Sequence, residues 1–138
     1  MPKFVELSLG DVVAQAQYQL TRDSLVRYAG ASGDFNTIHY RDDIAQSVGL
    51  PGVLAHGMLT MGVSVQPVVS WVGDAGRIVD YGVRFTKPVV VPPAGHALLD
   101  VKATVGLLDA ENQRVRIDLT TSFEESTVLG KAQVWVQF

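Results

Sequence analysis

An aspartate and a histidine lie within six residues of each other in the segment 28–42, which reads YAGASGDFNTIHYRD. Asp34 and His39 offer a carboxylate and an imidazole, and proteins use both groups for general acid–base catalysis. In a continuous helix they would point about 140° apart around the axis and could not act on one ligand. Gly30 and Gly33 precede them and favour an irregular loop instead. The spacing therefore predicts a loop that turns both side chains into one cleft.

Two further histidines and a glycine pair suggest other chemistry. His56, with Asp34 and His39, could form a set of two histidines and one carboxylate that binds a metal, but nothing in the spacing requires it. We expect no metal and interpret His56 as a structural residue at the start of a helix. His96 lies in a loop rich in proline and glycine and is expected at the surface. The segment 30–33 lacks the spacing of nucleotide-binding loops, so no such cofactor is expected.

A structural interpretation of these residues stays open at this level. Asp34 and Asn36 are residue types that often hydrogen-bond to loop backbone, and His39 would then be a packed or surface imidazole. Gly57 is expected to begin a helix, which leaves its N–H unpaired near the positive end of the helix dipole. Such an N–H can stabilise a developing oxyanion. A glycine at this position can also serve only to allow close packing.

The composition indicates an ordered, slightly acidic chain. Its 138 residues are 47% hydrophobic and 18% charged, with a net charge of −3, and we expect one domain over residues 1–138. No basic run is present, which argues against a nucleic-acid partner. The absence of cysteine excludes disulfides, a thiol nucleophile and Cys-ligated zinc. The N-terminus has no signal-peptide core, and polar residues interrupt the apolar region 53–72, so we expect a cytoplasmic protein with no membrane span.

Hydrophobic periodicity predicts one strand near the start of the chain and four after its middle. Thr21 and Asp42 are expected to cap short helices over residues 24–29 and 43–48. The predicted strands cover residues 12–20, 79–85, 99–107, 115–123 and 132–138.

Between the first strand and the other four, residues 55–72 are apolar on nearly all sides, which predicts a helix buried on most of its surface. Pro67 must kink this helix or divide it into a helix to about Gln66 and a second short one. Strands clustered at the end of the chain indicate an antiparallel sheet and an α+β fold. A strongly curved sheet around the helix would cover it.

The run from Tyr28 to His39 resembles the hydratase motif of the MaoC-like dehydratases and (R)-specific enoyl hydratases. The segments 55–58 (AHGM) and 83–86 (VRFT) resemble the helix start and the following strand of that family, and the overlap covers nearly the whole chain. More narrowly, the segments 28–40 and 49–62 are similar to the B subunits of the mycobacterial-type (3R)-hydroxyacyl-ACP dehydratases. The resemblance implies a hotdog fold, in which a curved antiparallel sheet wraps a long central helix.

The resemblance also implies a reaction. The family interconverts (3R)-hydroxyacyl and trans-2-enoyl thioesters of ACP or CoA without a cofactor or metal, and fatty-acid elongation is the expected context. Asp34 and His39 would be the acid–base pair, and the Gly57 N–H would be the oxyanion donor. The supporting residues would be Gly33, Asn36 and His56. Two alternatives remain: a non-catalytic hotdog subunit that binds acyl thioesters and supports an active partner, and a hotdog thioesterase.

One position departs from the family pattern. Thr37 stands where the family usually has proline, which would stiffen the turn between the proposed catalytic residues. Single hotdog domains usually pair, with active sites at the interface, so we expect a homodimer or a heterodimer with a related hotdog subunit. Trp71 and Trp135 are candidates for a partner surface.

Overall fold

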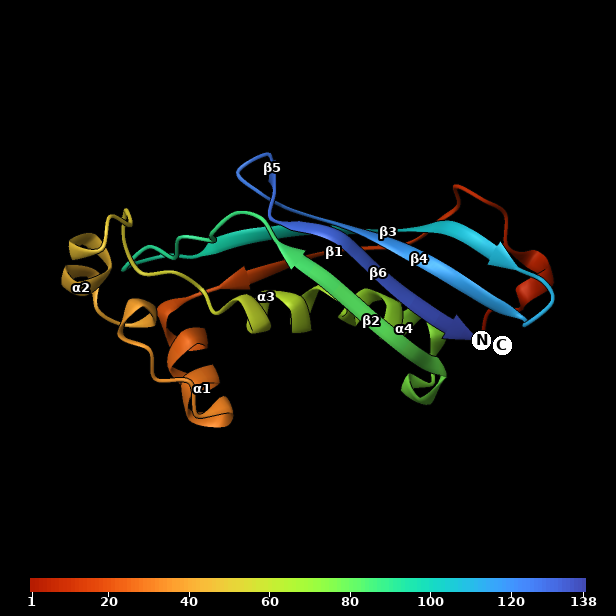
Figure 1. Cartoon of the computed structure of the whole chain (residues 1–138), viewed down its shortest axis with the longest axis horizontal. Helices are drawn as coiled ribbons and strands as arrows, with labels where there is room; N and C mark the ends of the chain where they lie inside the picture. Colours follow the sequence, from red (N-terminus) through yellow and green to blue (C-terminus); the bar gives the residue numbers. More distant parts are fainter.

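The computed structural model describes residues 1–138 as an antiparallel sheet with helices along one of its faces (Figure 1). The strands lie in the order β1-β3-β4-β6-β2, and the short β5 pairs with β4. The predicted α+β class is confirmed. The elements are η1 (Phe4–Glu6), β1 (Val12–Leu20), α1 (Arg22–Ser32), η2 (Thr37–His39), α2 (Asp42–Ser47), α3 (Gly57–Ser64), α4 (Gln66–Val72), η3 (Ala75–Arg77), β2 (Ile78–Phe85), β3 (Ala97–Asp109), β4 (Arg114–Phe123), β5 (Ser126–Thr127) and β6 (Leu129–Gln137).

Alternating side chains explain the main strands. In β3, Leu99 and Val101 are buried while Asp100 and Lys102 are exposed, because successive residues of a strand point to opposite faces. The five predicted strands are all present, with bounds that differ by at most a few residues at each end. Strand β5 was not predicted. It follows a turn at Glu124–Glu125, where both residues have positive φ although neither is glycine, so the sequence carries no turn signal.

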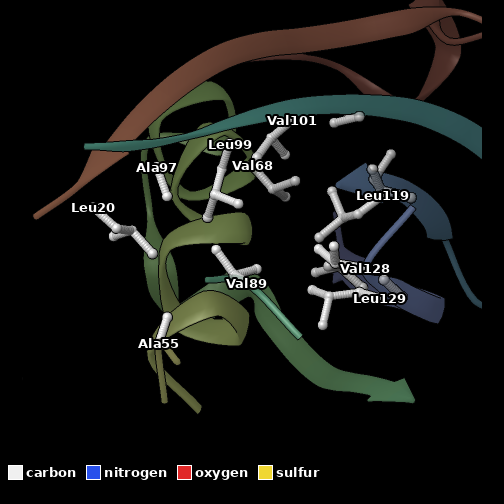
Figure 2. Packing of buried hydrophobic residues seen from close by; sticks show 14 of the residues in the cluster. Leu20, Ala55, Val68, Val89, Ala97, Leu99, Val101, Leu119, Val128 and Leu129 are labelled. Carbon is white, nitrogen blue, oxygen red and sulfur yellow. The ribbon is translucent and has the colours of Figure 1, made fainter. Parts of the chain in front are cut away.

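The predicted helix over 55–72 is divided at Val65 into α3 and α4, the second of the two expected arrangements. Pro67 causes no break in α4, because it occupies one of the first two positions, where a backbone N–H has no helical acceptor. α4 packs against β1 and β3. Figure 2 shows its Val68 beside Leu99 and Val101 of β3 in the buried hydrophobic cluster.

The expectation that this helix is buried on most sides is wrong for α3. Only Thr60 and Ser64 of α3 are buried, and Met58 is 58% exposed. Gly57, Met58 and Gly62 of α3 are exposed. Strand β2 is likewise an edge strand, and its apolar residues Val79 and Phe85 are about half exposed.

The helices α1 and α2 lie at one end of the sheet, and both termini lie at the other end (Figure 1). Thr21 caps α1 as predicted, in a capping box with Ser24. The helix runs further than expected and ends at Gly33, whose φ of 77° suits glycine. Asp42 does not cap α2 but is its first residue. None of the helices is both long and apolar enough to cross a membrane.

Candidate active site

Two hydrogen bonds to backbone carbonyls fix His39, one from its main chain and one from its ring. It ends the 3₁₀ helix η2, and its N–H donates to the Asn36 carbonyl at 3.0 Å. Its Nδ1 lies 2.7 Å from the Leu54 carbonyl oxygen. A carbonyl oxygen only accepts, so Nδ1 carries a proton, and in the neutral ring Nε2 is the nitrogen with the free lone pair. The Leu54 N–H in turn donates to the Ile38 carbonyl at 3.0 Å, which fixes the two segments together.

Asp34 approaches the free nitrogen of His39. The chain leaves α1 at Gly33, and the Asp34 N–H donates to the Ser32 hydroxyl at 3.1 Å. One carboxylate oxygen, Oδ1, accepts the Asn36 N–H at 3.1 Å. The other, Oδ2, lies 3.9 Å from His39 Nε2, which is too far for a direct hydrogen bond. The loop therefore brings the two side chains together, with an unpaired carboxylate oxygen opposite the second ring nitrogen of His39, but of the two only His39 lines the cleft beside Gly57.

Asn36 serves the backbone of this loop. Its Oδ1 accepts the Ile38 N–H at 3.2 Å and so caps η2. The structural interpretation of the loop is thus correct for Asn36 and for one oxygen of Asp34. It does not account for the second oxygen of Asp34, which makes no hydrogen bond within the chain and faces His39 Nε2.

His56 is enclosed beside this pair, with a residue exposure of 1%. Its ring stacks on that of His39 with centroids 3.8 Å apart, and the Tyr28 ring meets it edge-on at 4.7 Å. Its Nε2–H donates to the Asp34 carbonyl oxygen at 3.1 Å, and its buried Nδ1 has no hydrogen-bond partner. Burial lowers the pKa of His56, so the ring is neutral at physiological pH.

Asp34, His39 and His56 form a group of potential metal ligands, with one ligand atom of each residue within 4.8 Å of the others. His56 suits this role poorly. Its Nε2 is protonated and bonded to the Asp34 carbonyl, and its Nδ1 is enclosed. A metal would have to break that hydrogen bond to gain a third ligand, so the donor set fits an acid–base pair better than a metal centre.

Gly57 and His39 line one cleft of about 350 Å³. Gly57 is the first residue of α3, so its N–H has no acceptor within the helix, and it donates to no other backbone carbonyl. A Cβ at this position would lie 3.0 Å from the Phe85 ring, so a larger residue here would require that ring to shift. Asp34 is not among the lining residues. The lining comprises His39, Leu54, Ala55, Gly57, Thr60, Phe85, Thr86, Lys87, Pro88, Val89, Val128 and Leu129.

An ion pair that was not predicted joins the first residue of α1 to the first residue of α2. Arg22, at the start of α1, donates two hydrogen bonds to the Asp42 carboxylate at 2.8 and 3.0 Å and a third to the Val91 carbonyl at 2.8 Å. Asp42 also accepts the Val53 N–H at 3.2 Å. The bonds from Arg22 hold the pKa of Asp42 below its usual range. Nothing in the sequence relates two residues twenty positions apart in different helices.

The sequence also matches a known protein family. The family model described as the MaoC like domain matches residues 5–122. The chain belongs to the MaoC-like domain family. Three of the supporting residues, Gly33, Asn36 and His56, and the three proposed to act directly, Asp34, His39 and Gly57, all lie within the matched region.

Individual relatives of this MaoC-like domain are known. It is 38% identical over 96 residues to the 3-hydroxyacyl-thioester dehydratase X of Mycobacterium tuberculosis, a match that covers 70% of this chain and 30% of that protein. The fatty acid synthase beta subunit TOXC of Cochliobolus carbonum is 30% identical over 114 residues, which are 78% of this chain and 5% of that protein. The chain therefore spans less than a third of the length of either relative.

Solved structures show the same fold. A MaoC-like dehydratase superposes with a TM-score of 0.95 at 35% identity, over 99% of this chain and 42% of that one. The (R)-hydratase from A. caviae superposes with a TM-score of 0.81 at 18% identity, over 96% of this chain and 97% of that one. The expected resemblance and the expected hotdog fold are both confirmed, with the central helix in two segments.

Proposed function

We propose that this chain is a hydro-lyase that interconverts (3R)-hydroxyacyl thioesters and trans-2-enoyl thioesters. The observation that carries the proposal is the approach of Asp34 Oδ2 to His39 Nε2 at 3.9 Å, beside a cleft that is lined by His39 and by Gly57, the first residue of α3. The names of the relatives, a 3-hydroxyacyl-thioester dehydratase and an (R)-hydratase, support it.

Dehydration needs two proton transfers at neighbouring carbons. A base takes the proton from C2, and an acid protonates the hydroxyl that leaves C3 as water; hydration is the reverse. Asp34 and His39 supply these two functions as a coupled pair. The gap between Oδ2 and Nε2 is too wide for a mutual hydrogen bond and leaves room for the oxygen of the water or hydroxyl.

The Gly57 N–H stabilises the negative charge that reaches the thioester oxygen when C2 loses its proton. It lies at the positive end of the α3 dipole and is unpaired within the chain. Supporting residues keep the geometry. Gly33 turns the chain out of α1, Asn36 caps η2, and His56 bonds to the Asp34 carbonyl.

The proposed carrier of the acyl group is ACP or CoA. Both carriers hold the acyl group on an arm that contains phosphate. Lys87 is the one lysine or arginine that lines the cleft, and its ammonium would attract that phosphate. Fatty-acid elongation is the proposed context, and the fatty acid synthase subunits among the relatives support it.

We also propose that the chain works as a dimer, with a second copy or a related hotdog subunit. The exposed side of α3 and the unpaired edge of β2 carry exposed apolar residues, including Met58, Val79 and Phe85. Phe85 lines the cleft as well, so a partner on this surface would close the site from the open side.

The test is hydration of a trans-2-enoyl-CoA, followed by the loss of enoyl absorbance and by the stereochemistry of the product. Asp34→Asn and His39→Ala should each lower kcat by about 10²–10⁴-fold. Two matched controls change the same residue types elsewhere. Asp43 is an exposed carboxylate that pairs with Arg41, and His96 lies in an exposed loop, so Asp43→Asn and His96→Ala should leave kcat unchanged.

Other outcomes would replace the proposal. Full activity in both Asp34→Asn and His39→Ala would remove this loop as the active site. Tight binding of the enoyl-CoA without turnover, alone and with candidate partner subunits, would indicate a non-catalytic binding subunit. Release of free CoA from a saturated acyl-CoA would indicate a thioesterase.

A further inference from the structure

Thr60 lies one turn after Gly57 in α3 and lines the same cleft as Gly57 and His39. Its residue exposure is only 3%. Residues three apart lie on the same face of a helix, and the Cα–Cβ bond tilts toward the helix N-terminus. Thr60 therefore shares a helix face with Gly57, and its Cα–Cβ bond tilts toward the turn that Gly57 begins.

The Thr60 hydroxyl is the one buried hydroxyl of the chain without an internal hydrogen bond. The other two, on Ser64 and Thr121, bond to each other at 2.9 Å. Thr60 uses only its backbone, which donates to the His56 carbonyl at 3.1 Å and accepts the Ser64 hydroxyl at 2.7 Å. Its Oγ1 is not among the fully enclosed unpaired atoms, so it remains open to the cleft. Polar groups in such positions are normally hydrogen-bonded, and here the partner must come from the cleft.

We infer that the Thr60 hydroxyl is a second catalytic donor to the thioester oxygen, beside the Gly57 N–H. The inference rests on the proposed function. When C2 loses its proton, the electron pair of that C–H bond moves through C1 and places negative charge on the thioester oxygen. The charge returns as the C2–C3 double bond forms and the C3–O bond breaks. The two donors act while the charge is on oxygen.

The position of Thr60 is fixed by the sheet. The Thr121 hydroxyl of β4 donates to Ser64, and the Ser64 hydroxyl donates to the Thr60 carbonyl. These bonds connect the middle of α3 to β4 through buried groups, where a lost hydrogen bond is costly. A donor held in this way needs no rearrangement when the charge develops.

The experiment compares Thr60→Val, Thr60→Ser and Thr121→Val in the hydration assay. Valine has the shape of threonine without the hydroxyl, so Thr60→Val should lower kcat by about 10²-fold with little change in KM. Thr60→Ser should restore most of the activity. The thermal midpoint of Thr60→Val should match the wild type, because no internal hydrogen bond is lost. Thr121→Val should lower the midpoint, because it removes the buried hydrogen bond from Thr121 to Ser64.

A second measurement needs no turnover. In an Asp34→Asn background, an aryl-conjugated trans-2-enoyl-CoA should show a red-shifted absorbance when bound, and Thr60→Val should reduce the shift. Wild-type kcat in Thr60→Val, or an unchanged shift, would overturn the inference, and so would a Thr60→Ser variant as slow as Thr60→Val. If His39→Ala loses activity while Thr60→Val keeps it, only this inference fails. If neither the wild type nor any variant hydrates the enoyl-CoA, the proposed function fails instead.

Discussion

The imidazole of His56 touches both members of the proposed acid–base pair. It stacks on the His39 ring and donates to the main chain of Asp34, and its own second nitrogen is buried without a partner. A charged ring here would lie against His39 in a site closed to water. Burial accordingly lowers the pKa of His56, and the neutral ring acts as a spacer that fixes Asp34 relative to His39.

This burial predicts a pH dependence of stability. Between the lowered pKa of folded His56 and the ordinary value of about 6.5, the unfolded chain takes up a proton that the folded chain does not. The free energy of unfolding should therefore fall as the pH falls through that window. His56→Gln removes this titration and keeps an amide donor for the Asp34 carbonyl. The slope of its free energy of unfolding against pH should therefore be smaller, by the uptake of at most one proton. Urea unfolding at several pH values measures both curves, and parallel curves would contradict the assignment.

The residues proposed to act directly were found in the sequence because they are close along the chain. Asp34 and His39 share one loop, and Gly57 begins an element that hydrophobicity reveals. The Arg22–Asp42 pair and the free hydroxyl of Thr60 were missed, because each depends on which helices and strands meet in space. In the sequence, Thr60 is only one more small residue of an apolar helix.

At the scale of elements, the turn η2 determines how His39 meets Asp34. Its first residue, Thr37, occupies the usual proline position of the family, and the structure suits proline there. The Thr37 N–H makes no hydrogen bond within the chain. The preceding Asn36 has φ −58° and ψ 126°, the extended conformation that a residue before proline prefers. The side-chain cap from Asn36 to Ile38 would be unaffected.

Thr37→Pro should therefore stabilise the chain by about 0.4–1 kcal/mol, because it restricts the unfolded state without strain in the folded one. Activity should stay the same or rise. Tyr40→Pro is the contrasting control. Tyr40 has φ −150°, and its N–H donates to the Thr37 carbonyl at 3.2 Å, so proline there should destabilise the fold. The measurement is the thermal unfolding midpoint of each variant relative to the wild type. A lower midpoint for Thr37→Pro would show that the turn cannot accommodate proline.

The order of elements was predicted better than their ends. Period-two alternation located all five main strands, since one face of each lies on the core. The ends of α1 and α2 were less accurate, although Thr21 caps α1 as predicted, and for α2 the reason is a tertiary contact. Asp42 is the type of residue that caps a helix, but its carboxylate is taken by Arg22 and the Val53 N–H. The exposure of α3 was missed because hydrophobicity does not distinguish a core from an interface.

At the scale of the whole molecule, the two edges of the sheet differ. At one edge, β2 lies near α3, and together they expose Met58, Val79 and Phe85. At the other edge, β1 lies over α4, whose buried residues include Val68 and Val72. An unpaired edge beside an uncovered apolar helix is the arrangement that a second hotdog domain would cover.

We expect the purified chain to sediment with twice its mass of 14.9 kDa. Val79→Lys, on the β2 edge, should shift it to the monomer, because a charge would be buried in the interface. Val79 is 48% exposed within one chain, so the fold should survive and the circular dichroism spectrum should not change. Hydratase activity should fall with dissociation, since Phe85 and the cleft would lose their cover.

Val12→Lys places the same charge on the opposite edge strand, β1, at a residue that is 55% exposed, and it should leave the dimer intact. Dissociation by Val12→Lys but not by Val79→Lys would move the interface to β1 and leave the exposed face of α3 without a partner.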